Sequence, residues 1–119
     1  ESVELVYDET ESVEFTDFIK TEMKVAEVID VAPVDGSNKL LRFRLDAGDK
    51  GHRQILSGIA KYYLDHEALI GKKVIVVANL KPRKMMGYIS QGMILSSESD
   101  GKLSLLFADP EAANGSLIG

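Results

Sequence analysis

The sequence contains no cysteine and no tryptophan, and only two of its 119 residues are histidine. The absence of cysteine excludes disulfides, thiolate nucleophiles, iron–sulfur clusters and cysteine-ligated zinc. No apolar run approaches the roughly eighteen residues that a membrane-spanning helix needs, and the first residues lack the basic and apolar parts of a secretory signal. We therefore expect a cytoplasmic protein that is stabilised by packing alone.

The residue patterns of catalytic and metal sites are missing as well. The two histidines, His52 and His66, have no Ser-His-Asp order, carboxylate pair, phosphate loop or glycine fingerprint around them. The pair His66-Glu67 is not followed by the second histidine of a zinc helix. We expect both histidines to be solvated surface residues, and we predict no catalytic residue, no metal site and no cofactor in this chain.

The length and composition are those of one soluble globular domain. Hydrophobic residues make up 45% of the chain and charged residues 28%, and the mean hydropathy is -0.04. This balance can bury one core, and 119 residues leave no room for a second core of similar size.

Charge is segregated along the chain. The net charge of -5 disfavours a polyanionic partner, but residues 1–17 hold seven acids and no base. The rest of the chain is slightly basic, with fourteen bases against twelve acids. No acid lies between Glu67 and Glu98, whereas that stretch contains Lys72, Lys73, Lys81, Arg83 and Lys84. A local positive field is therefore expected there.

Short β-type segments separated by turn residues predict an all-β fold. Leu41, Phe43 and Leu45 alternate with Arg42 and Arg44, which indicates a half-buried strand with a charged outer face. Five strands are predicted, at 23–31, 41–46, 52–57, 73–80 and 87–96, with a short helix or 3₁₀ turn within 58–70. This order is that of a five-stranded OB-fold barrel with a helix between strands 3 and 4, a barrel commonly used for oligonucleotides.

Three smaller expectations accompany this barrel. Gly92 is expected to mark a bulge or bend in the fifth strand, and residues 103–108 are expected to form one more strand. Phe15, Phe18 and Phe43 are interpreted as core residues. Tyr88 is the best candidate among three tyrosines for stacking on a base.

The strongest candidate for a binding surface is the segment 81–84, which we predict to be a basic loop after the most buried strand. Cationic side chains at such a place would contact phosphates and release counterions. A solvated loop with no ligand explains the same spacing. Ser90 and Gln91 could hydrogen-bond a base or ribose, and Met85, Met86 and Met93 could form an apolar contact beside the loop.

Five ordered segments resemble the tRNA-binding domain family, which includes the C-terminal domain of bacterial methionyl-tRNA synthetases, a free-standing structure-specific tRNA-binding protein and a chaperone-like relative. The resemblance covers about residues 15–108. It rests on Phe18-Ile19-Lys20 and on segments 57–63 (SGIAKYY), 69–73 (LIGKK), 77–87 (VANLKPRKMMG) and 90–95 (SQGMIL).

The resemblance implies an OB fold that binds tRNA by shape and phosphate contacts, without catalysis, and a homodimer built through the segments that flank the barrel. The residues carried over to this chain as tRNA contacts are Lys39, Arg53, Asn79, Lys81, Arg83, Lys84, Ser90, Gln91 and Met93. Ile89 departs from the family pattern, because it replaces an acid that often precedes the Ser-Xaa-Gly-Met motif.

These observations predict three segments: an acidic linker or tail at 1–14, the tRNA-binding barrel at 15–108, and a C-terminal extension at 109–119 that contributes to dimerisation. The acidic start and the missing initiator methionine favour a domain from the end of a methionyl-tRNA synthetase, whose remainder would then be a partner. Two alternatives stay open: a dimeric peptide-binding chaperone of the same fold, and a module that only dimerises its parent enzyme.

Overall fold

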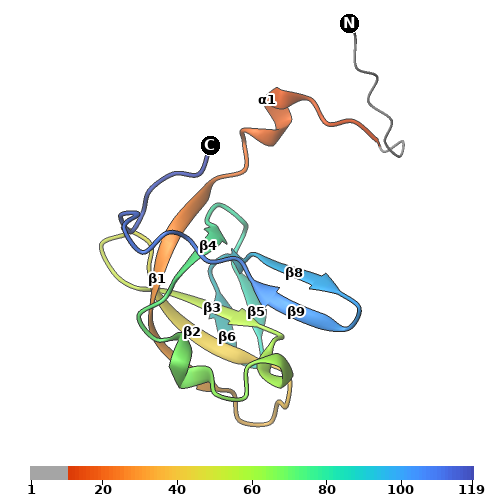
Figure 1. Cartoon of the computed structure of the whole chain (residues 1–119), viewed down its shortest axis with the longest axis vertical. Coiled ribbons are helices and arrows are strands. Elements are labelled where there is room, and N and C mark those ends of the chain that lie inside the picture. The colour runs from red at the N-terminus through yellow and green to blue at the C-terminus, as the bar shows by residue number, and fades with distance from the viewer. Residues whose placement is uncertain (1–10) are drawn as a thin grey trace, which may run out of the picture.

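The computed structural model describes residues 11–119, so most of the predicted acidic tail lies outside the described residues. Strands dominate, and helices are short (Figure 1). The elements are α1 (Phe15–Phe18), β1 (Met23–Pro33), β2 (Leu41–Asp46), β3 (Arg53–Ser57), the 3₁₀ helices η1 (Ala60–Tyr62) and η2 (His66–Leu69), β4 (Lys73–Val77), β5 (Arg83–Met85), β6 (Tyr88–Ser90), β7 (Met93–Ile94), β8 (Ser96–Ser99) and β9 (Lys102–Leu105).

Five antiparallel strands form one strongly curved sheet in the order β3-β2-β1-β4-β7. The two edges approach each other where the backbone N–H of Gln91, between β6 and β7, donates to the carbonyl oxygen of Gln54 in β3 at 2.7 Å. The predicted OB-type barrel is thus confirmed as a nearly closed five-strand barrel. The predicted helix between strands 3 and 4 is present as η1 and η2.

The barrel interior is filled by the apolar half of each alternating strand. In β2, Leu41, Phe43 and Leu45 are almost completely buried, while Arg42 and Arg44 lie on the outer face. Ile55 of β3 and Val74 and Val76 of β4 meet them in the centre. Burial of these side chains is the main favourable contribution to the stability of a chain that has no cysteine.

Gly92 breaks the predicted fifth strand into β6 and β7. Its φ of +136° suits glycine, and a Cβ at this position would stand 2.6 Å from the carbonyl oxygen of Val77. Only glycine allows the chain to turn this closely across β4. The expected bend at Gly92 is confirmed, and it separates the surface hairpin β5–β6 from the sheet.

The C-terminal segment returns to the beginning of β1. Residues 96–105 form the hairpin β8–β9 instead of one strand at 103–108, and the chain then crosses β4 at Phe107. Further on, the backbone N–H of Val25 donates to the Ser116 oxygen at 2.9 Å, and the N–H of Gly115 donates to the Val25 oxygen at 2.7 Å. Residues 115–118 and the short helix α1 therefore lie at the same end of the barrel, where β1 begins (Figure 1).

Phe15 and Phe18 do not belong to the core, and the prediction that they do is wrong for this chain. Their exposed fractions are 71% and 52%, whereas Phe43 is fully buried as expected. Both lie on α1, which stands off the barrel beyond the start of β1 (Figure 1). No helix within residues 11–119 is long and apolar enough to cross a membrane.

Candidate nucleic-acid interface

The hairpin β5–β6 carries the predicted basic residues. Its two turn residues, Met86 and Gly87, both have positive φ angles, 51° and 85°, as a tight type I′ hairpin turn requires. Arg83 and Lys84 are strand residues of β5, so the predicted loop is wrong for these two and right for Lys81. All three side chains are exposed.

The pairing of the hairpin decides which way each cation points. Lys84 lies opposite Ile89 and Arg83 lies opposite Ser90. Because neighbouring residues of a strand point to opposite faces, Arg83 faces the barrel side together with Ser90, and Lys84 faces away from it. The hairpin therefore presents positive charge on both of its faces.

An apolar groove with a cationic rim lies on the barrel side of the hairpin. Its volume is about 510 Å³, and no acid lines it. The sulfur-containing side chain of Met93, with 47% exposed, and that of Leu80, with 48%, are accessible in it. The residues around the groove are Leu56, Leu80, Lys81, Arg83, Met85, Ser90, Gly92 and Met93.

Lys39 belongs to the loop between β1 and β2, and its side chain is exposed. This loop approaches the hairpin turn, because a Cβ placed on Gly36 would lie 3.4 Å from Cε of Met86. The structure therefore brings the loop of Lys39 next to the hairpin that carries Arg83 and Lys84. In OB folds, the loops at these two places frame the oligonucleotide-binding face.

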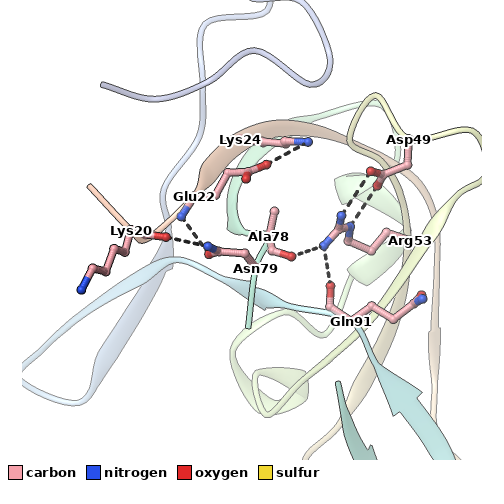
Figure 2. Close-up of polar contacts among 8 residues, drawn as sticks. All are labelled: Lys20, Glu22, Lys24, Asp49, Arg53, Ala78, Asn79 and Gln91. Atoms are coloured by element: carbon pink, nitrogen blue, oxygen red, sulfur yellow. Dashed lines mark hydrogen bonds and ion pairs between the residues drawn. The ribbon is translucent and has the colours of Figure 1, made fainter. Parts of the chain in front are cut away.

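Arg53 is largely buried and already paired. Its Nε and Nη2 donate to the carboxylate of Asp49 at 3.0 and 3.2 Å, and Nη1 donates to the carbonyl oxygens of Ala78 and Gln91 at 2.6 and 3.0 Å (Figure 2). Only 15% of its side chain is exposed. One guanidinium thus ties β3 to the segments that follow β4 and β6 through charge-assisted hydrogen bonds.

Asn79 bonds to the chain that precedes β1. Its Oδ1 accepts the backbone N–H of Glu22 at 2.8 Å, and its Nδ2 donates to the carbonyl oxygen of Lys20 at 2.6 Å (Figure 2). Both polar atoms of the amide are therefore engaged with the segment between α1 and β1. Asn79 connects the basic hairpin region to the end of the barrel that carries α1.

Ser90 and Gln91 form the seam between the hairpin and β3. The hydroxyl of Ser90, which is 4% exposed, accepts the backbone N–H of Leu56 at 3.1 Å. Oε1 of Gln91 accepts the backbone N–H of Gln54 at 2.9 Å. These side chains substitute for missing backbone partners at the barrel edge, and Ser90 lies under the surface instead of on it.

Tyr88, the predicted stacking candidate, meets Arg42 at this surface. The guanidinium carbon of Arg42 lies 4.8 Å from the centre of the Tyr88 ring. The alternation in 41–46 correctly placed Arg42 on the outer face of its strand. Its contact with Tyr88 arises only when the hairpin folds back over the sheet, and no local sequence signal announces that.

A second groove, of about 480 Å³, lies at the start of β1 between the residues that follow α1 and the C-terminal segment. Apolar Ile19, Met23, Leu117 and Ile118 line it together with charged Lys20, Glu22 and Lys24. Phe15 and Phe18, on α1 just before it in the chain, are exposed as well.

Asp46 at the end of β2 anchors this C-terminal segment. Its carboxylate accepts the backbone N–H of Gly48 at 3.0 Å and the side-chain amide of Asn114 at 3.2 Å. These two hydrogen bonds, the backbone one first, lower the pKa of Asp46 below its ordinary value of 3.8. Ionised Asp46 therefore holds Asn114 close to the barrel.

The fold and its surface define an OB-fold barrel with a cationic hairpin and an apolar groove beside it. The model of the family described as "Putative tRNA binding domain" matches residues 23–117, and the chain belongs to that tRNA-binding domain family. The expected resemblance is confirmed. As its place in this family implies, the chain is a tRNA-binding domain homologous to the C-terminal part of methionyl-tRNA synthetases.

Curated relatives that match this chain in sequence include methionine–tRNA ligases. The chain is 62% identical over 120 residues to methionine–tRNA ligase of Streptococcus pneumoniae serotype 4, covering 100% of this chain and 18% of the relative. It is also 62% identical to methionine–tRNA ligase of Oceanobacillus iheyensis over 115 residues, covering 97% of this chain and 17% of that relative. The chain thus spans less than one fifth of the length of these curated relatives.

Solved structures share the whole barrel. A protein from Pyrococcus horikoshii titled as related to MetRS superposes with a TM-score of 0.86 at 35% identity, covering 92% of this chain and all of the other. The chaperone CsaA of Bacillus anthracis superposes with a TM-score of 0.80 at 26% identity, covering the same shares.

Proposed function

We propose that Lys39, Lys81, Arg83 and Lys84 contact tRNA phosphates, and that the adjacent groove, with Met93 in it, contacts the nucleosides. The observation that carries this proposal is that the four cationic side chains are exposed and that none of them forms an ion pair within residues 11–119. Unpaired cations on a hairpin and an adjoining loop can exchange their counterions for phosphates at low cost.

The other four predicted contacts act mainly through position. Arg53, Asn79, Ser90 and Gln91 hold the hairpin and the flanking segments in place through the hydrogen bonds described above. A surface that is ordered before binding loses less conformational entropy when RNA docks. Recognition of tRNA shape depends on this fixed spacing of cations and groove.

As part of a methionyl-tRNA synthetase, the domain would raise the local concentration of tRNA at the catalytic region, which lies elsewhere in such an enzyme. The proposal rests on the identity to methionine–tRNA ligases over 18% of their length. We propose that the domain acts in the cytoplasm.

Exposed apolar side chains before β1 and in the C-terminal segment support a homodimer. The exposed fractions of Phe15, Phe18, Ile19 and Leu117 are 71%, 52%, 56% and 70%. Exposed apolar surface of this kind often marks a protein–protein interface. Pairing of α1 and the extension 109–119 with the same elements of a second copy would cover them. Two copies would also place two basic hairpins on one assembly, which increases avidity for a large RNA.

A peptide-binding chaperone is the second candidate function. The likeness to CsaA and the apolar lining of the groove favour it. Met86 is at the hairpin turn and does not line that groove, which reduces the expected apolar contact to Met85 and Met93. Binding of an unfolded peptide in the groove would depend far less on salt than binding of tRNA.

The test is reversal of the three cations of the hairpin region, Lys81→Glu, Arg83→Glu and Lys84→Glu, in one variant. We expect loss of tRNA binding, and a log–log salt slope that is smaller by about two to three units in any residual binding. Lys102→Glu on β9 is the matched control, because Lys102 is an exposed lysine on another hairpin. Size-exclusion chromatography checks that the dimer persists, and unchanged tRNA affinity of the triple variant contradicts the proposal.

A further inference from the structure

A cation–π pair of side chains lies on the barrel face outside the groove proposed above. Arg42 projects from the outer face of β2, and Tyr88 is a half-buried residue of β6. The guanidinium carbon lies 4.8 Å from the ring centre, which is the distance of a cation–π contact. The hairpin has to fold back over the sheet to create this pair.

Strand pairing and one hydrogen bond position the backbone around Tyr88. Tyr88 pairs with Met85 within the hairpin. On the sheet side, Nε2 of Gln54 donates to the carbonyl oxygen of Ile89, the next residue after Tyr88, at 2.9 Å. The hairpin is thus anchored to β3 beside Tyr88, and the ring lies within cation–π distance of Arg42 on β2.

Arg42 also lines an adjoining concave pocket of about 290 Å³. Arg44, two residues further along β2, is exposed at the same pocket, and Asp30 is its single acid. Within residues 11–119, neither arginine forms an ion pair. Their hydrogen-bond donors are thus available to an anionic ligand, and the pocket has an excess of positive charge.

We propose that Arg42 and Tyr88 form a stacking platform for one unstacked nucleobase of the bound tRNA, with Arg44 at the phosphate of that nucleotide. A planar guanidinium held on an aromatic ring offers a π-like plane and a positive charge at once, which suits the face of any base. The pocket admits a nucleotide edge next to that plane. The platform lies on the strand 2–3 face of the barrel, and so extends the interface from the hairpin onto the sheet.

This proposal rests on the proposed function, since it names a further contact of the same RNA. The two can fail separately. Reversal of Lys81, Arg83 and Lys84 tests the phosphate surface, whereas the platform is tested by variants that preserve charge.

The experiment compares tRNA affinity and its salt dependence for the unchanged chain and for Arg42→Lys, Tyr88→Phe and Tyr88→Leu. Arg42→Lys keeps the charge and removes the plane, so we expect about five- to tenfold weaker binding with an unchanged salt slope. Tyr88→Phe keeps the ring and should stay within about twofold. Tyr88→Leu should resemble Arg42→Lys, and thermal unfolding verifies that each variant is folded; if Tyr88→Leu does not fold, Arg42→Lys decides.

A second readout uses a short single-stranded RNA that contains 2-aminopurine, whose fluorescence is quenched on stacking. The unchanged chain and Tyr88→Phe should quench it, and Arg42→Lys should quench it less. A blunt RNA duplex with the same number of phosphates has no unstacked base. It should therefore bind the unchanged chain and Arg42→Lys equally. If Arg42→Lys binds tRNA and quenches like the unchanged chain while the triple reversal abolishes binding, the platform is refuted and the phosphate surface stands.

Discussion

The hydroxyl of Ser90 accepts the backbone N–H of Leu56 at 3.1 Å, so a residue predicted to contact tRNA also supports the barrel edge. Within the described residues, β6 pairs with β5, and no strand ladder joins it to β3. The side chains of Ser90 and Gln91 supply the acceptors that the ladder lacks there. The motif that identifies the family thus also closes its barrel.

Ser90→Ala should destabilise the domain by about 1–3 kcal/mol, because the buried N–H of Leu56 loses its acceptor. Urea unfolding followed by circular dichroism measures the change. Ser97→Ala on the exposed hairpin β8–β9 is the control, and it should change the free energy of unfolding by less than about 0.5 kcal/mol. Equal stability of the two variants would show that the seam does not depend on this hydroxyl.

Asn79→Ala should loosen the segment between α1 and β1, because both hydrogen bonds of the amide to Lys20 and Glu22 disappear. A loss of about 1–2 kcal/mol in local stability corresponds to roughly ten-fold faster amide exchange around Glu22. Hydrogen-exchange mass spectrometry of the peptides that cover residues 15–25 measures it. Asn38→Ala, in the exposed loop before β2, is the matched control. Unchanged amide exchange in Asn79→Ala would show that the two hydrogen bonds of Asn79 do not hold this segment.

The lowered pKa of Asp46 predicts that the domain loses stability as the pH falls. This pKa in the folded protein lies below the ordinary value of 3.8, so the unfolded chain takes up the proton first as the pH falls. The stabilisation from ionised Asp46 is fully present above that ordinary value and is lost as the pH drops through the folded pKa. Asp46→Asn should therefore show a smaller loss of stability between pH 5 and pH 2 than the unchanged chain, by urea unfolding at each pH.

The control for that comparison is Asp35→Asn, which removes an exposed carboxylate in the loop between β1 and β2. It changes the net charge by the same amount without touching Asn114. If the two asparagine variants have the same pH profile as the unchanged chain, the bond between Asp46 and Asn114 contributes nothing to acid stability.

Residue alternation, turn residues and the order of strands and helix together predicted the barrel. The period of two in 41–46 placed Phe43 inside and Arg42 outside, and both placements are confirmed. Gly92 predicted a bend because glycine can adopt backbone angles that other residues rarely adopt. Such signals depend on neighbours in the sequence, which is why they can be read without the fold.

Relations between distant segments could not be predicted in this way. Phe15 and Phe18 look like core residues by type, but the barrel is filled without them and they remain exposed on α1. The cation of Arg53 looked available for phosphate until folding placed Asp49 and two carbonyl groups around it. Charge and hydrophobicity are local properties, whereas availability depends on the partners that the fold supplies.

The most direct test of the account is binding of the unchanged chain to unfractionated tRNA over a range of salt concentrations, with a DNA duplex of similar charge as competitor. Four phosphate contacts predict a log–log slope of about -3 to -4, and the DNA should not displace the tRNA at equal phosphate concentration. Absence of binding at low salt, or equal displacement by the duplex, would contradict recognition of tRNA through the hairpin and its groove.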